Sequence, residues 1–336
     1  PLFWKEFSSI RKKHKISKTV INTMLLSLVR GKKANAFLIE TSNKYKSDCT
    51  LHVYNYWCND MALGTALFHK SNPHIKCISR THGSDVYHEA SACNYLPYRS
   101  FIANNLSTIY TISNYGKQYI QKEWGNVSKA AITISKLGVN NSFGINTSIK
   151  KDNNLKIISC SSFSLVKRLD LLIKAFSLIK NFNIEWIHIG NGELQNEIIQ
   201  LAKTTLTASN INFTFTDRIK NRELFKLYNS INADLFINVS STEGIPVSIM
   251  EAISFGTPII ATNVGAVNEI VNEKNGILLP PNPSPEQIAF SISNFNDLSP
   301  EAILKMRKAS RFKWETDYKA EENYSNFTNK IITKAT

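Results

Sequence analysis

Short apolar runs alternate with longer amphipathic runs along the chain from residue 50 onward. Runs of the first kind are typical of buried strands, and runs with apolar residues three or four positions apart are typical of helices. In the first half we expect strands at 50–57, 75–80, 108–113 and 131–134. In the second half we expect them at 155–160, 184–189, 211–215, 234–239, 258–261 and 276–279. This alternation predicts an α/β fold with parallel sheets wrapped by helices.

The second half contains a complete set of helical patterns between its strands, so it is predicted to be a doubly wound domain. These patterns lie near 167–180, 192–203, 220–229, 246–255 and 264–271. The polar, Asn-rich segment 139–154 has no periodicity and is expected to be an interdomain linker. Two more helical patterns, from about 300 to 332, are expected to pack back across the first domain. The predicted domains are therefore 1–150, 151–305 and, for the C-terminal helices, 306–336.

The net charge of +14 is concentrated in one half of the chain. Residues 1–150 hold 20 Lys or Arg and 7 Asp or Glu, a net of +13, whereas residues 151–336 hold 20 and 19, a net of +1. Near the start, five cations lie close to Phe3, Trp4 and Phe7; they are Arg11, Lys12, Lys13, Lys15 and Lys18. Such a mixture suits an anionic membrane surface. Nucleic acid would attract the same charge, and a solvated basic helix that binds nothing is the third interpretation.

Composition also bears on the cellular compartment. The chain has no run of about 18 apolar residues and no charged, then apolar leader, so we expect a cytoplasmic protein rather than a membrane-spanning or secreted one. The cysteines number five, with no C-x-x-C pair. An odd number without such a pair favours reduced thiols over a disulfide framework or a zinc site, and we expect these cysteines to be small core residues.

The most informative segment is Ser240-Ser-Thr-Glu-Gly-Ile-Pro-Val-Ser-Ile-Met-Glu-Ala-Ile-Ser-Phe-Gly-Thr-Pro, which follows a strand. Pro246 suits the start of a helix, and Gly256 suits the position just past its end. A helix that begins at the carboxyl end of a strand presents its first amides and its dipole to an anion. Glu243 and Glu251 flank this helix start, and carboxylates accept hydrogen bonds from sugar and ribose hydroxyls.

This segment resembles the signature of the family-4 retaining glycosyltransferases, two glutamates eight positions apart, and especially members from capsule and lipopolysaccharide synthesis. The resemblance implies a GT-B architecture, two Rossmann-like domains facing a cleft. It also implies that Glu243 contacts the donor sugar and that Glu251 holds the ribose hydroxyls. The backbone that follows Glu243 would bind the phosphates. Its residues are Gly244, Ile245, Val247 and Ser248, and we expect the helical amides to be available as far as Ile249.

A second segment, Ser159-Cys-Ser-Ser-Phe-Ser-Leu-Val-Lys-Arg-Leu-Asp, resembles the family's strand and loop that carry an arginine and a lysine for the diphosphate. The lysine position falls on Lys167. The arginine position falls on Ser162, a departure from the family pattern, and Arg168 is a candidate substitute. A lysine stabilises the charge that develops on a departing diphosphate.

Two more segments on the nucleotide side resemble the family. Ile187-His-Ile-Gly-Asn-Gly places Gly190 and Gly192 at the end of a strand, where a backbone without Cβ atoms can approach a ligand. The motif lacks the full dinucleotide fingerprint. Phe213-Thr-Phe-Thr-Asp-Arg-Ile resembles the segment whose backbone contacts the base, which makes Ile219 a candidate.

In the first half, the segment Ser79-Arg-Thr-His-Gly-Ser-Asp ends a predicted strand, and ligands of such folds bind beyond that sheet edge. The resemblance places His82 at the catalytic centre, beside the donor sugar or the attacking hydroxyl. Arg80 and Asp85 are candidates for contact with the acceptor. The aromatic segments 54–57 and 96–99 resemble regions near the acceptor site, although such residues are more often core.

The resemblance implies retaining transfer of a hexose from a UDP- or GDP-sugar to a glycan or lipid-linked acceptor in surface polysaccharide synthesis. We expect no metal and no cofactor, because Lys167 and the helix start supply the positive charge. The expected location is peripheral, at the inner face of the plasma membrane, with no nucleic-acid partner. A sugar-nucleotide 2-epimerase of the same architecture and a non-catalytic basic binding protein are the alternatives. The family's first strand and glycine-rich loop are not found, so we expect an incomplete N-terminal domain.

Overall fold

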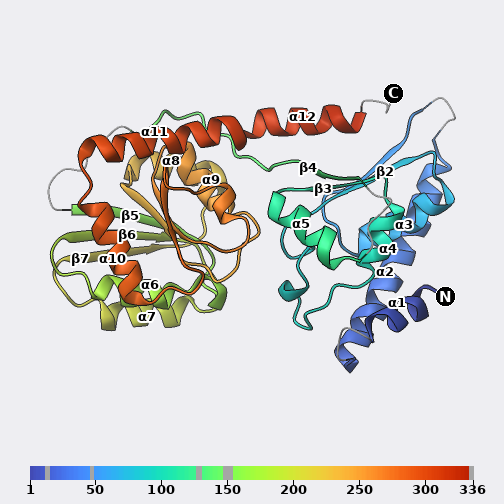
Figure 1. Ribbon diagram of the computed structural model, residues 1–336, viewed down its shortest axis with the longest axis horizontal. Coiled ribbons are helices and arrows are strands. Elements are labelled where there is room, and N and C mark those ends of the chain that lie inside the picture. The colour runs from blue at the N-terminus through green and yellow to red at the C-terminus, as the bar shows by residue number, and fades with distance from the viewer. Residues whose placement is uncertain (12–15, 46–48, 126–130, 147–153, 333–336) are drawn as a thin grey trace. The chain divides into compact units, whose positions relative to one another are not determined.

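The computed structural model describes residues 1–11, 16–45, 49–125, 131–146 and 154–332. Residues 147–153 of the expected linker lie outside this part of the chain, as do Lys12, Lys13 and Lys15. The chain divides into two compact units. Unit 1 is Pro1–Lys136 with Asn326–Thr336, and unit 2 is Leu137–Ser325. Each unit contains one parallel sheet (Figure 1).

The sheet of unit 2 has six parallel strands in the order β10-β9-β8-β5-β6-β7. They are β5 (Asn154–Cys160), β6 (Asn183–Ile189), β7 (Ile211–Thr216), β8 (Leu235–Asn238), β9 (Ile259–Thr262) and β10 (Gly276–Leu279). All six were predicted from the apolar runs, within one or two residues. The chain runs outward from β5 through β6 to β7, then returns to β8 on the other side of β5. The order therefore reverses between β5 and β8, the point at which sheets of this kind bind ligands.

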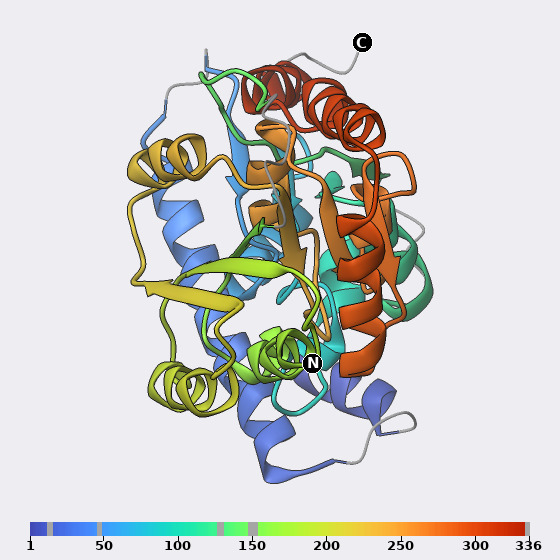
Figure 2. The same ribbon diagram turned by 90° about the vertical axis from the view of Figure 1, so that its left-hand side faces the viewer.

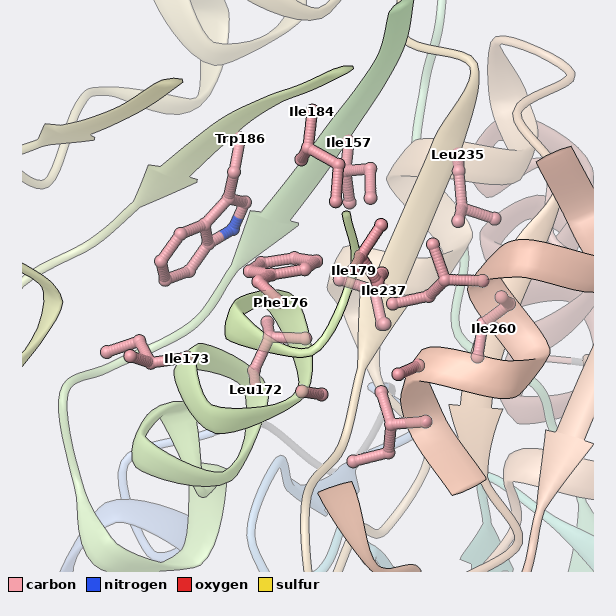
Figure 3. Close-up of a cluster of buried hydrophobic side chains, with 14 of the residues drawn as sticks. Ile157, Leu172, Ile173, Phe176, Ile179, Ile184, Trp186, Leu235, Ile237 and Ile260 are labelled. Atoms are coloured by element: carbon pink, nitrogen blue, oxygen red, sulfur yellow. The ribbon is translucent and has the colours of Figure 1, made fainter. Parts of the chain in front are cut away.

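Helices cover both faces of this sheet (Figures 1 and 2). On one face lie α6 (Leu169–Ser177), α7 (Gln195–Thr205) and α10 (Pro285–Asn296), and on the other α8 (Asn221–Ile231), α9 (Val247–Ser254) and α11 (Pro300–Asp317). Figure 3 shows the core between α6 and the sheet, where the ring centroids of Phe176 and Trp186 are 5.1 Å apart. Both side chains are fully buried. Burial of one such side chain stabilises the fold by roughly 1.5–3 kcal/mol.

The helix boundaries around the signature segment largely follow the prediction. Pro246 is the N-cap of α9, and Gly256 follows the helix in the left-handed region at φ 75°. The expected helix at 264–271 was wrong: only a 3-10 turn, η3 (Val267–Glu269), forms there. Gly265 takes φ 57°, and the Ala266 amide donates to the Gly244 carbonyl 3.0 Å away. That segment is thus held against the signature loop instead of continuing as a helix.

Unit 1 has four parallel strands in chain order: β1 (His52–Asn55), β2 (Lys76–Arg80), β3 (Thr108–Thr111) and β4 (Ala131–Ile134). All four were predicted. The helices between them are α3 (Asp60–Ser71), α4 (Arg99–Asn105) and α5 (Asn114–Glu123), with a 3-10 turn η1 (His88–Ala90) before α4. Figure 1 shows these helices on one face of the sheet, as expected when parallel strands follow one another in chain order and the crossovers have one hand. Two further helices, α1 (Leu2–Ile10) and α2 (Lys18–Ser42), precede β1, and α2 packs against α3.

The other face of this sheet is covered by the end of α12 (Ala320–Ile332). The Phe327 ring lies 5.3 Å from the ring of Tyr54 and 5.0 Å from that of Tyr110, and the Arg80 guanidinium lies 4.8 Å above it. The two predicted helices at 300–332 are therefore present as α11 and α12. Cys58 and Cys77 are buried as expected, whereas Cys49 is exposed and is not a core residue.

Candidate functional site

Two loops at the switch point of unit 2 bring together the two strongest candidates from the sequence. Lys167 ends the 3-10 turn η2 (Leu165–Lys167) after β5, and Glu243 lies in the loop after β8. The Lys167 Nζ is 2.7 Å from the Glu243 Oε1, and the Asn238 side-chain amide donates to the same oxygen over 3.2 Å. The two charged side chains are only 21% and 10% exposed. A charge-assisted hydrogen bond in such a setting is stronger than on an open surface.

Arg168, the next residue, fastens these loops together. Its backbone is left-handed at φ 50°, which costs a non-glycine residue on the order of 1 kcal/mol. Its guanidinium donates to the Val239 carbonyl over 2.6 Å and to the Ser240 and Pro281 carbonyls over 2.9 Å each. A fourth bond, of 3.2 Å, reaches the Asn282 side chain. Arg168 thus makes its contacts with the protein itself, and its expected role as a phosphate ligand in place of Ser162 stays a prediction.

Backbone contacts complete the joint between these loops. The Ser241 amide donates to the Val166 carbonyl over 2.8 Å. A Cβ on Gly190, at φ 146°, would lie 2.0 Å from the Ser161 carbonyl oxygen, and one on Gly265 would lie 1.8 Å from that of Glu243. Only glycine fits at such distances. Gly190 was a candidate from the sequence, whereas Gly265 was missed because its stretch was read as helix. A Cβ on Gly192 would lie 2.5 Å from the Phe163 carbonyl oxygen.

Glu251 lies in α9, only 5% exposed. The Asn221 side-chain amide of α8 donates to its Oε1 over 3.0 Å. Burial raises the pKa of Glu251 to about 7, because the charged form loses hydration, and the hydrogen bond from Asn221 acts in the opposite direction. A large share of this carboxyl group is therefore protonated at neutral pH.

The remaining backbone candidates lie around the start of α9. Val247 and Ser248 are its first two residues, and the Ile249 amide donates to the Pro246 carbonyl over 3.2 Å. The amides expected to be available for an anion thus end before Ile249. Gly244 accepts the bond from Ala266, and Ile245 is buried beside it. Ile219 is half-buried in the loop between β7 and α8.

Sequence reasoning missed a buried polar cluster under the Gly190 turn. His188 is fully buried in β6, and its Nδ1 is hydrogen-bonded to the Ser159 hydroxyl over 2.8 Å. That hydroxyl also accepts a 2.9 Å bond from the Trp186 indole. Burial lowers the pKa of His188 to about 4, so the ring is neutral at physiological pH. The cluster joins β5 to β6 immediately below the loops that carry Lys167 and Gly190.

Unit 1 places its own candidates after β2. His82 is 8% exposed and Asp85 is 4% exposed. The Asp85 carboxylate accepts the His82 amide on Oδ1 over 2.7 Å and the Cys58 amide on Oδ2 over 2.8 Å. Arg80 is 1% exposed, and its guanidinium donates to the Ser135 and Lys136 carbonyls over 2.7 and 2.8 Å. Asp85 and Arg80 thus hold loops of the protein, and their expected contact with an acceptor stays a prediction.

Comparisons with known proteins identify the family of this chain. A family model described as "Glycosyl transferases group 1" matches residues 144–311, which are 168 of the 336 residues. The chain therefore belongs to the group 1 glycosyltransferase family, and both of its parallel sheets fit the GT-B fold of its structural neighbours.

Two curated relatives and one solved structure illustrate the similarity. An uncharacterized glycosyltransferase of Haemophilus influenzae is 29% identical over 178 residues, covering 52% of this chain and 48% of the relative. The putative colanic acid biosynthesis glycosyltransferase WcaL of Escherichia coli is 33% identical over 94 residues, covering 26% and 23%. The crystal structure of Anabaena HepE in complex with UDP and glucose has a TM-score of 0.68 at 16% identity, covering 89% and 81%. The chain spans about half the length of the first relative and about a quarter of the second.

None of the helices in the part of the chain that the structure describes is both long enough and apolar enough to span a bilayer.

The four hydrogen bonds of the Arg168 guanidinium lead to a prediction about stability. Arg168→Lys should destabilise unit 2 by about 1–3 kcal/mol, because an ammonium group cannot reach carbonyls on two separate loops at once and leaves some of them unpaired. The measurement is chemical denaturation of the purified protein. Arg222→Lys, at an exposed position of α8, is the matched control and should change stability by less than about 0.5 kcal/mol. Equal stability of the two variants would show that Arg168 does not hold the loops.

Proposed function

We propose that this chain is a retaining, metal-independent hexosyltransferase that moves a sugar from a nucleotide diphosphate to a glycan or lipid-linked acceptor in surface polysaccharide synthesis. The observation that carries the proposal is the contact of Lys167 with Glu243 at the switch point, with the buried Glu251 in the helix that follows. WcaL supports the polysaccharide context by its name, and HepE, with UDP and glucose bound, supports a nucleotide-sugar donor.

The charged groups of unit 2 would bind the diphosphate and the hydroxyls of the proposed donor. A diphosphate placed at Lys167 and the first amides of α9 would gain both a point charge and the positive end of the helix dipole. The diphosphate would compete with Glu243 for the Lys167 ammonium. Glu243 would then accept hydrogen bonds from hydroxyls of the sugar. Glu251 would accept hydrogen bonds from the ribose hydroxyls, and these bonds favour its ionised form.

The same groups would serve the transition state. As the bond to the sugar lengthens, negative charge grows on the departing diphosphate, and Lys167 stabilises that charge more than it stabilises the bound donor. The acceptor oxygen is proposed to attack the anomeric carbon on the face that the diphosphate leaves, so that retention requires no protein nucleophile, and an oxygen of the departing diphosphate takes the proton of the attacking hydroxyl. His82 of unit 1 is proposed to contact the sugar or that hydroxyl.

The test is turnover of a donor panel by the full chain. With UDP-glucose, UDP-galactose, UDP-N-acetylglucosamine and GDP-mannose, and a pool of oligosaccharide and lipid-linked acceptors, release of nucleoside diphosphate from the preferred donor should fall on the order of 10²-fold in Lys167→Met. The matched control Lys174→Met, at an exposed position of α6, should leave the rate unchanged. EDTA should also leave the rate unchanged, and its abolition by EDTA with recovery on adding magnesium would refute the metal-independent mechanism.

The same panel separates the alternatives. A sugar-nucleotide 2-epimerase would convert UDP-N-acetylglucosamine without acceptor and yield N-acetylmannosamine. A non-catalytic basic protein would bind RNA or lipid in a salt-sensitive manner and would show no affinity for any donor. Either result would replace the proposed function.

We further propose that unit 1 brings the enzyme to the anionic inner face of the plasma membrane through α2. One face of α2 packs against α3, while the other exposes Leu25, Leu26, Val29 and Phe37 by 45%, 55%, 52% and 62%. Leu26, Val29, Lys33 and Phe37 follow one another at helical spacing along that face. Residues 1–45 hold ten Lys or Arg and two Asp or Glu, a net of +8. Exposed apolar residues among cations are typical of helices that lie in a membrane interface.

Vesicle sedimentation tests the membrane proposal. The protein should bind vesicles of mixed phosphatidylglycerol and phosphatidylcholine and should bind pure phosphatidylcholine weakly. The double variant Leu26→Gln, Val29→Gln should bind the mixed vesicles several-fold less, at roughly 25 cal/mol lost per Å² of apolar surface. Phe290→Gln, which removes an apolar residue that is 67% exposed on α10 of unit 2, is the matched control. Equal binding by all three proteins would contradict the role of α2.

A further inference from the structure

Two aromatic side chains stand exposed at the carboxyl end of β1. Tyr56 and Trp57 are 47% and 43% exposed, although aromatic residues of this segment were expected to lie more often in the core. That expectation was wrong for these two, because β1 ends at Asn55 and the following residues leave the sheet. Large aromatic rings kept on a surface at this edge of a parallel sheet indicate a place where something packs against them.

The two rings flank His82. The Tyr56 and Trp57 rings lie 4.5 Å and 4.2 Å from the His82 ring between centroids, inclined to it by 41° and 40°, and they meet each other edge to face at 5.8 Å. Within the described ranges, both ring nitrogens of His82 are buried and have no hydrogen-bond partner. A buried polar group in that state costs free energy unless a ligand satisfies it.

Asp85 holds this arrangement in place. Its carboxylate accepts the amide of Cys58, next to Trp57 in the chain, and the amide of His82 itself. One buried side chain therefore fixes the loop after β1 against the loop after β2. The Arg99 guanidinium donates to the Asp85 carbonyl over 3.2 Å, and that of Arg80 donates to carbonyls of residues 135 and 136. The cations here serve the loops, so the surface is not arranged for an anionic group.

We infer that Tyr56 and Trp57 form a stacking platform for one pyranose ring of the acceptor glycan, with His82 hydrogen-bonded to a hydroxyl at the ring edge. A pyranose has an apolar face of C–H groups, which packs on the negative face of an aromatic ring, and a rim of hydroxyls that both donate and accept. This combination matches two exposed rings beside a histidine whose ring nitrogens make no hydrogen bond within the described ranges, the nearer carboxylate oxygen of Asp85 being 3.9 Å from Nδ1. The inference rests on the proposed function and assigns the acceptor, rather than the donor, to these residues.

Acrylamide quenching of tryptophan fluorescence tests the platform in the full chain. Of the five tryptophans, Trp124, Trp186 and Trp314 are at most 3% exposed, so in a Trp4→Phe background the accessible one is Trp57. The probes are methyl α-D-glucopyranoside, methyl α-D-galactopyranoside and methyl α-D-mannopyranoside. Sorbitol, which has the hydroxyls without the ring, is the control probe. At least one pyranoside should protect Trp57 from quenching in a saturable manner, and sorbitol should not.

Variants at Tyr56 sharpen this test. In the same background, Tyr56→Ala should shift the protection to several-fold higher pyranoside concentrations, whereas Tyr56→Phe, which keeps the ring face, should retain it. Tyr45→Ala, an exposed tyrosine beyond α2, is the matched control. Donor binding, measured as the thermal shift produced by the donor panel, should be unchanged in every variant.

The outcomes separate the two proposals. If a donor binds and no pyranoside protects Trp57, or if sorbitol protects it equally, the platform is overturned while the proposed function stands. If no donor binds, the proposed function fails irrespective of Trp57.

Discussion

The joint between the loops after β5 and β8 is the contact on which the candidate site depends. Arg168 reaches the Val239 and Ser240 carbonyls across this joint, and the Ser241 amide returns a bond to Val166. Because these bonds fix both backbones, Lys167 and Glu243 meet at 2.7 Å although 76 positions separate them in the chain. The left-handed backbone at Arg168 is a local cost that four side-chain bonds offset. The position of Lys167 thus depends on the contacts of its neighbour Arg168.

Partial burial strengthens the ion pair at the centre of the candidate site. The Lys167 and Glu243 side chains are largely removed from water, so their attraction is less screened than that of a surface pair. Neither charge can be left alone at such a position without a cost in desolvation. The proposed donor would keep both charges partnered, with its diphosphate at Lys167 and its hydroxyls at Glu243. Glu251, whose pKa burial raises although Asn221 donates to it, would gain further hydrogen bonds from the ribose.

The strands and the signature segment were predictable from the sequence because they follow from local rules. Buried parallel strands are apolar runs, and Pro246 and Gly256 mark the ends of α9 by their backbone preferences. The errors arose where tertiary contacts override the local pattern. The stretch 264–271 has a helical pattern, yet Gly265 must approach the Glu243 carbonyl and the helix does not form. The α10 helix was missed although Ser284 and Gln287 form a capping box. Neither the orientation of Arg168 nor the exposure of Trp57 has any signature in sequence spacing.

Calorimetric binding of the preferred donor at pH 7, in two buffers of different ionisation enthalpy, tests the central claim most directly. Burial raises the pKa of Glu251 to about 7, and ribose hydroxyls favour its ionised form, so binding at pH 7 should release a fraction of a proton. The release should shrink above pH 8, where the group is already ionised, and should vanish in Glu251→Gln. Donor binding without proton release in the wild-type protein, or with equal release in Glu251→Gln, would contradict the account of this site.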